Sequence, residues 1–139
     1  MKELEKLLNE IRHLRNCSIS FLGVKVHDNQ ASMGKLAALF GLKDLDYIYI
    51  EIPLEEASAI LTQLLHKDMA YDSQILPLGK ASDFVARIMN QIDSRKAHFY
   101  TNRRLGSSIW NPATEATFDN GILILQEEKI ICIWFGDED

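Results

Sequence analysis

Apolar residues recur at helical spacing in three separate segments of the first two thirds of the chain. The spacing predicts amphipathic helices near the N-terminus, after Pro53, and after Ser82 or Asp83, either of which can cap a helix. A shorter helix is expected over 30–40, because Gly41 follows it as a C-cap residue would. The three apolar stripes comprise Leu4, Leu7, Leu8, Ile11 and Leu14; Ala57, Ile60, Leu61, Leu64 and Leu65; and Val85, Ile88, Met89 and Ile92.

Strand patterns lie between these helices and dominate the C-terminal third. Segments rich in β-branched and aromatic residues predict strands over 17–26, 47–52, 97–101, 108–110, 114–118, 121–125 and 129–135. The run Asp119-Asn120-Gly121 predicts a hairpin turn, since Asn and Gly tolerate positive φ, and Glu127-Glu128 predicts the turn that follows. The expected fold class is therefore α+β, with a mostly antiparallel sheet, a C-terminal β-meander and helices packed on one face.

Length and composition predict a single globular domain over 1–139. Of the 139 residues, 47% are hydrophobic and 25% are charged, which is ordinary for a folded protein of this size. Residues 1–15 alternate Lys and Glu with Leu and lack the apolar core of a signal peptide, and no segment reaches the ~18 apolar residues of a membrane span. A cytoplasmic protein without membrane contact is expected. Cys17 and Cys132 lie in apolar runs, where a reduced cysteine behaves as a small buried hydrophobe.

Negative charge is concentrated at the C-terminal end of the chain. Residues 113–139 contain seven of the 20 acidic residues and only one basic residue, Lys129, whereas the preceding residues are nearly balanced and the whole chain has a net charge of −5. A patch of one sign indicates what a protein binds rather than how it folds. The acidic segment is therefore the first candidate for a binding surface.

No segment has the spacing of a catalytic or ligand-binding motif. Gly79-Lys80 lacks both the earlier glycine and the following hydroxyl of a phosphate-binding loop, and no Gly-x-Ser-x-Gly sequence occurs. The four histidines are scattered and neither cysteine has a second cysteine near it, whereas structural zinc sites cluster their ligands. We therefore expect no catalytic residues, no metal and no cofactor, and a protein that is not an enzyme.

One basic run surrounds two aromatic residues, a composition found in proteins that bind single-stranded nucleic acid. The net charge of −5 would repel phosphate over most of the surface, so nucleic acid is not an expected partner. An ordinary solvated turn, or an internal partner for the acidic end, is the favoured interpretation. The run comprises Arg95, Lys96, His98, Arg103 and Arg104, and its aromatic residues are Phe99 and Tyr100.

Two C-terminal segments resemble those of a known class of proteins: Trp110 to Asp119, with the sequence WNPATEATFD, and Ile133 to Asp139, with the sequence IWFGDED. They resemble the small acidic immunity proteins of bacterial toxin–immunity systems, including those of contact-dependent growth inhibition. The resemblance implies a cytoplasmic protein that binds one cognate protein toxin and blocks its active site or its access to substrate. A basic nuclease would fit the charge map, because an acidic surface mimics phosphate and speeds encounter by steering.

The expected contact residues are the acids of this segment together with one tryptophan that could anchor the interface. Trp110 precedes Asn111-Pro112 in a loop-like setting, where a large ring can be half exposed, as in a binding hot spot. Strand alternation can send some of the acids to opposite faces of the sheet. The candidates are Trp110, Glu115, Asp119, Glu127, Glu128, Asp137 and Glu138.

Two other functions remain open from the sequence. One is a small enzyme whose pocket is built from separate strands, with Tyr49, His98, Arg103 and Arg104 as its residues. A deep pocket lined by those side chains would favour it. The other is a structural adaptor whose acidity keeps it soluble, and self-association through an exposed strand edge would be its signature.

Overall fold

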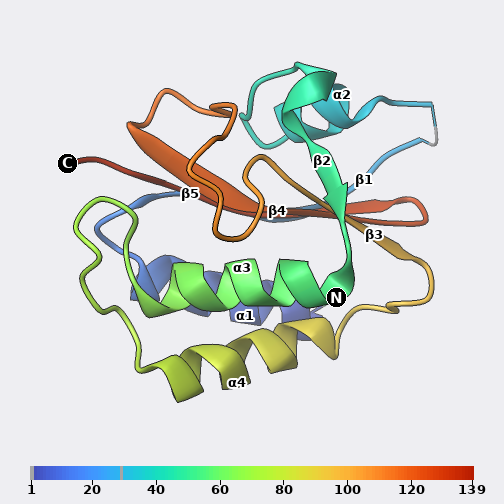
Figure 1. Cartoon of the computed structure of the whole chain (residues 1–139). Helices are drawn as coiled ribbons and strands as arrows, with labels where there is room; N and C mark the ends of the chain where they lie inside the picture. The colour runs from blue at the N-terminus through green and yellow to red at the C-terminus, as the bar shows by residue number, and fades with distance from the viewer. Residues whose placement is uncertain (1, 29) are drawn as a thin grey trace.

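The computed structural model describes residues 2–28 and 30–139 and is built on one five-stranded antiparallel sheet (Figure 1). The strand order is β1-β5-β4-β3-β2. The strands are β1 (Ile19–Val26), β2 (Ile50–Ile52), β3 (Ala97–Thr101), β4 (Phe118–Gln126) and β5 (Lys129–Asp137). Because β3, β4 and β5 follow one another in the sequence and in the sheet, the predicted α+β class with a C-terminal meander is confirmed.

Three helices cover one face of the sheet: α1 (Lys2–Leu14), α3 (Leu54–His66) and α4 (Leu78–Met89), as Figure 1 shows. Their predicted apolar stripes face the sheet and are buried, except that Leu14 and Met89 are only partly buried and the buried Ile92 lies beyond the end of α4. They pack on strand residues that alternate toward this face, as side chains of period two require. Those strand residues include Leu22, Val24, Phe99, Ile122, Ile124, Ile131, Ile133 and Phe135.

The opposite face is covered by smaller elements: helix α2 (Met33–Ala38), the 3₁₀ helix η1 (Asp46–Ile48) and the loop over 102–117 (Figure 1). The fully buried Trp134 is the centre of this second core. Tyr49 packs edge-on against it, with ring centroids 5.9 Å apart, and donates its hydroxyl proton to the carbonyl oxygen of Lys43 at 2.6 Å. The three long helices thus share one face as predicted, while the short α2 lies on the other.

The predicted hairpin at Asp119-Asn120-Gly121 is wrong, because β4 runs straight through these residues. Gly121 is needed there for close packing rather than for a turn: a Cβ atom on it would lie 2.4 Å from the carbonyl oxygen of Ile133 and 2.5 Å from the Cα of Trp134. The meander turns at the next predicted site instead, where Glu127 adopts a φ of 54°.

Other element boundaries differ from the prediction for identifiable reasons. α4 begins at Leu78 with Pro77 as its N-cap residue, so the predicted cap at Ser82 or Asp83 is wrong and both residues lie inside the helix. The strand predicted over 47–52 is shortened by η1 to β2, and the segments 108–110 and 114–117 lie in a loop. Ser32 caps α2 by accepting a hydrogen bond from the amide of Lys35 at 3.4 Å.

Cys132 is fully buried as predicted, and burial raises the pKa of its thiol well above the usual value. Cys17 is exposed, contrary to prediction, because it lies in the turn between α1 and β1 rather than in the strand. None of the helices in the described ranges is long and apolar enough to cross a bilayer.

Candidate functional site

The longest irregular segment in the described ranges is the loop over 102–117, which connects β3 to β4; its tip reaches α3, while Ala113 packs into the second core. Long loops without secondary structure in compact domains are usually functional when they are ordered. This loop is ordered by specific contacts at three points: a buried carboxylate beneath it, an aromatic stack at one side, and an ion pair to α3. Each of the three is described below.

Asp119 is 2% exposed and organises the base of the loop. It faces the loop because alternation in β4 puts it on the same side as Gly121. Its carboxylate accepts five hydrogen bonds at 2.8–3.2 Å, and two of the donors are backbone amides of the loop itself. The donors are Asn102 Nδ2, the amides of Ala113 and Thr114, Thr114 Oγ1, and the indole Nε1 of Trp134.

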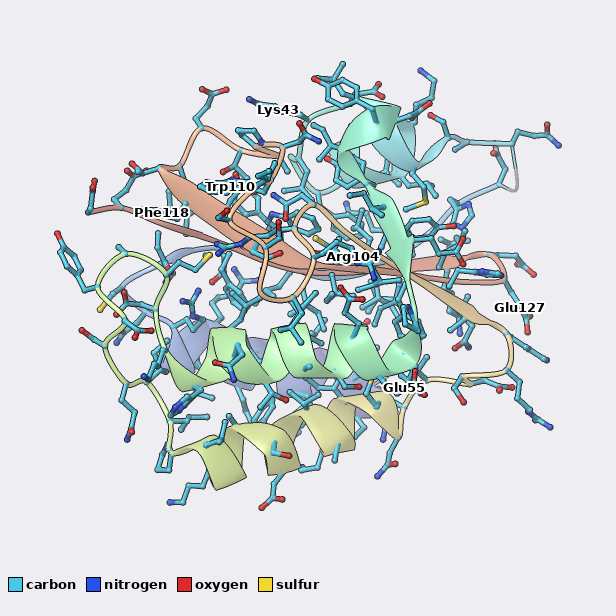
Figure 2. All side chains as sticks on the ribbon, in the orientation of Figure 1. Lys43, Glu55, Arg104, Trp110, Phe118 and Glu127 are labelled. Carbon is cyan, nitrogen blue, oxygen red and sulfur yellow. The ribbon has the colours of Figure 1, made fainter. Side chains whose placement is uncertain are left out.

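Trp110 is half buried and lies between two partners (Figure 2). Its ring stacks on Phe118 with centroids 6.3 Å apart and planes at 28°, and the guanidinium of Arg103 lies 5.3 Å from the centroid of the indole ring. Arg103 is in turn fixed by donating from Nε to the carbonyl oxygen of Ser107 at 2.6 Å. The stack therefore holds the middle of the loop in one conformation.

The ion pair to α3 joins Arg104 to Glu56 (Figure 2 labels Arg104). Arg104 donates from Nε and Nη2 to the two carboxylate oxygens, both at 2.8 Å, and the amide of Leu105 adds a third bond at 3.1 Å. These bonds to Arg104 hold the pKa of Glu56 below its usual value. The tip of the loop is consequently tied to the helical layer, and its apolar side chains are presented outward.

The loop exposes two large aliphatic side chains: Ile109 is 82% exposed and Leu105 is 50% exposed. Trp110, next to Ile109 in the sequence, is half buried. A hollow of about 550 Å³ lies between the loop tip and α3, lined by Leu64, Lys67 and Met69 as well as by Leu105 and other residues of the tip. Exposed apolar side chains beside a hollow suit a surface that accommodates another protein.

A second hollow, of about 390 Å³, lies at the far end of the loop beside the start of β1. Its floor is apolar and includes Ile19, Phe21 and Ala113. Its rim carries two of the predicted contact residues, Glu115 and Glu138. The Glu115 side chain is 97% exposed, and its nearest cation is Lys43, with 3.8 Å between the ammonium nitrogen and the carboxylate oxygen.

The structure brings together only part of the predicted contact set. Trp110, Glu115 and Glu138 lie in or beside the loop, and Glu138 accepts a hydrogen bond from the amide of Thr117 at 3.1 Å. Glu127 and Glu128 lie at the opposite end of the sheet, since β4 has nine residues and spans about 30 Å. Figure 2 shows Glu127 at one end of the molecule and Trp110 at the other.

Asp119 and Asp137 are inside the protein, so they cannot belong to an exposed acidic patch in this conformation. Asp137 is 5% exposed and accepts hydrogen bonds from Arg15 Nη2 at 2.8 Å, from the amide of Met69 at 2.9 Å, and from Ser18 Oγ. It joins the end of α1 to the connection between α3 and α4. The two aspartates hold the loop and the helical layer in place, while other residues form the surface.

The residues of the possible enzyme pocket are not gathered in one place. Tyr49 is buried in the second core, and burial raises the pKa of its hydroxyl well above the usual value. His98 is exposed on β3, where its Nδ1 lies 2.8 Å from a carboxylate oxygen of Glu51. Arg103 and Arg104 belong to the loop. No hollow detected in the described part of the chain is lined by all four of these side chains.

The sequence analysis missed the residues that present this surface: Ile109, Leu105, Asn102 and the Glu56 anchor. A signal was available, because 102–112 is rich in Asn, Gly, Ser and Pro, which favours a loop over the predicted strand at 108–110.

Within residues 2–28 and 30–139, no cluster of three or more His, Cys, Asp or Glu side chains has metal-binding geometry. In comparisons with known proteins, no family model, no curated protein and no solved structure matches this chain.

Proposed function

We propose that this protein is an immunity-type inhibitor that binds a cognate protein toxin through the loop over 102–117. The observation that carries the proposal is the fixation of this loop by the five hydrogen bonds of Asp119, while its apolar residues point to solvent. A loop that is already ordered loses little conformational entropy on binding. A buried carboxylate that fixes the conformation of an exposed loop is best explained if the shape of the loop surface is needed for binding.

The composition of the loop surface suits a protein partner. Ile109 and Leu105 offer apolar contact, Trp110 offers an aromatic anchor fixed by its stack on Phe118, and Glu115 adds negative charge at the edge. Aromatic and apolar residues at the centre with charge at the rim are the usual anatomy of an interface. The negative charge would steer a basic toxin domain toward the loop and reject acidic proteins.

The contact set proposed for the complex is therefore narrower than the acidic segment as a whole. Trp110, Glu115 and Glu138 stay in it, and Ile109 and Leu105 join it because they are exposed on the same loop. Asp119 and Asp137 act as positioning residues. Glu127 and Glu128 lie too far along the sheet to contact the same compact partner domain, and Glu127 already pairs with Lys96 at 3.0 Å.

The test is a binding measurement with matched surface variants. The purified chain captures proteins from a lysate of its source cell at low salt, and each captured protein is produced alone and titrated against the wild type by calorimetry. Ile109→Asp should weaken the cognate complex by about 2 kcal/mol or more, because a hot-spot residue would be replaced by a charge. Leu78→Asp is the control, since Leu78 is 51% exposed on α4, away from the loop.

A growth assay tests the same proposal in cells. A captured protein that stops growth when expressed alone, and no longer does so when this chain is co-expressed, identifies a toxin and its inhibitor. Protection should be lost with Ile109→Asp and retained with Leu78→Asp. If both variants bind and protect as the wild type does, the loop is not the interface and the proposal is wrong.

A further inference from the structure

Strand β1 forms one edge of the sheet. It pairs with β5 along its full length, and no other strand of residues 2–28 and 30–139 pairs with its outer side. Its two ends are strongly apolar and exposed: Ile19 is 55% and Val26 is 73% accessible to solvent. A long edge strand of this kind is a template for pairing with another strand.

The register between β1 and β5 determines whether the backbone N–H and C=O groups of each β1 residue point toward β5 or outward. The amide of His27 donates to the carbonyl oxygen of Glu128 at 2.8 Å, in line with the pairing of Val26 and Lys129. In an antiparallel pair, alternate residues direct their N–H and C=O groups to the neighbouring strand. The odd-numbered residues of β1 therefore bond to β5. Those with outward-pointing backbone groups are Ser20, Leu22, Val24 and Val26.

On the helical side, the edge is flanked by charges of opposite sign. A hollow of about 260 Å³ beside Leu22 and Val24 is lined on α1 by Glu5 and Arg12, both of which are exposed. The short turn over 15–18 makes α1 antiparallel to β1. Arg12 is therefore nearer to the Ile19 end of the strand, and Glu5 is nearer to the Val26 end.

The other face of the edge carries the exposed Lys25 near the Val26 end of the strand, whereas Glu138 is bonded to the amide of Thr117 on the β4 side and does not face the free edge. The helical side of the edge thus has a base at one end and an acid at the other. This is the pattern that lets a surface complement itself across a two-fold axis, where each end meets the opposite end of the second copy.

We infer that a second copy of this chain pairs with β1, antiparallel and centred on Leu22, so that the two sheets become one. The outward-facing residues then pair as Ser20 with Val24, Leu22 with Leu22, and Val24 with Ser20, which gives about six backbone hydrogen bonds. Glu5 of each copy faces Arg12 of the other. The exposed ends of the strand are covered by the same contact.

This interface is independent of the toxin-binding proposal. Glu5 and Arg12 lie on α1 and belong to the dimer alone, and no residue of the proposed loop surface takes part in it. Experiments on the purified full-length chain, without any partner, test the dimer by itself. A monomeric result would leave the loop surface and its proposed function untouched.

The first experiment is sedimentation velocity of the 15.9 kDa chain over a dilution series, with charge-swapped variants. The wild type should reach twice the monomer mass at high concentration. Glu5→Arg and Arg12→Glu should each weaken the dimer about tenfold, because like charges then face each other twice across the axis. The double variant Glu5→Arg/Arg12→Glu should restore it. A monomeric wild type, or a double variant no stronger than the singles, would overturn the inference.

The second experiment reads the register by amide hydrogen exchange at low and high protein concentration. The amides of Ser20, Leu22 and Val24 face outward in the monomer, so their exchange should slow as the concentration rises. The amides of Phe21 and Gly23 bond to β5 and are internal controls whose exchange should not change. Concentration-independent exchange at all five amides would overturn the proposed β1 pairing.

Discussion

The sharpest test of the loop's construction is the variant Asp119→Ala. Removing the carboxylate leaves three buried N–H donors without acceptors: the amides of Ala113 and Thr114 and the indole N–H of Trp134. The Thr114 hydroxyl also loses its acceptor, whereas Asn102 keeps its bond to the carbonyl oxygen of Asn111 at 3.0 Å. Each orphaned N–H donor costs about 1–3 kcal/mol, so the free energy of unfolding should fall by about 3–9 kcal/mol. That is a large share of the ~5–15 kcal/mol by which a domain of this size is stable.

Urea unfolding followed by tryptophan fluorescence measures this loss. With a slope of about 2 kcal/mol per molar urea, the midpoint should fall by roughly 1.5–4.5 M. Glu115→Ala is the control, because an exposed acid 3.8 Å from its cation should change the unfolding free energy by less than about 0.5 kcal/mol. A loss below about 1 kcal/mol for Asp119→Ala would show that the loop does not depend on the carboxylate, and the reasoning above would fail.

Three further outcomes are expected. Gly121→Ala should destabilise the fold severely, because its Cβ would meet backbone atoms at 2.4 and 2.5 Å, whereas Gly79→Ala, with nothing within 4 Å, should be neutral or stabilising in thermal melts. The pKa of Glu56 is lowered on folding, so its contribution to stability is present above its unfolded pKa and is lost as the pH falls through the folded value; the stability difference between wild type and Glu56→Gln should therefore vanish in acid unfolding curves. A thiol reagent should modify Cys17 in the native protein and reach Cys132 only on unfolding, and equal rates at both would contradict the burial described here.

Much of the fold could be predicted from periodicity alone. The stripes of α1, α3 and α4 are determined by local spacing, and most of the predicted residues are buried, with Leu14 and Met89 partly so. The hairpin error shows where local rules fail. Asn120-Gly121 has turn chemistry, but Gly121 is used to let β4 approach the backbone of Trp134, a contact between distant residues that no short window of sequence reports.

The candidate site was predictable only in part, for a related reason. Clustering along the sequence identified Trp110, Glu115 and Glu138, which do lie in or beside the loop. It failed for Asp119 and Asp137, because burial depends on which face of a strand a residue occupies and on what covers that face. Neither the loop above Asp119 nor the Arg15 guanidinium beside Asp137 could be placed before the sheet order was known.

The charge map consequently has a different meaning in three dimensions. Of the acids in the C-terminal segment, Asp119 and Asp137 are buried and hold the architecture, and Glu127 pairs with Lys96 at the far hairpin. The net charge of −5 still acts on any partner at long range, since a distant charge responds to the whole protein and not to one patch. In the proposed complex, short-range discrimination would come from the loop, which carries the exposed apolar side chains and Glu115. If that proposal holds, high salt should slow association with the toxin but leave its dissociation governed by Ile109 and Trp110.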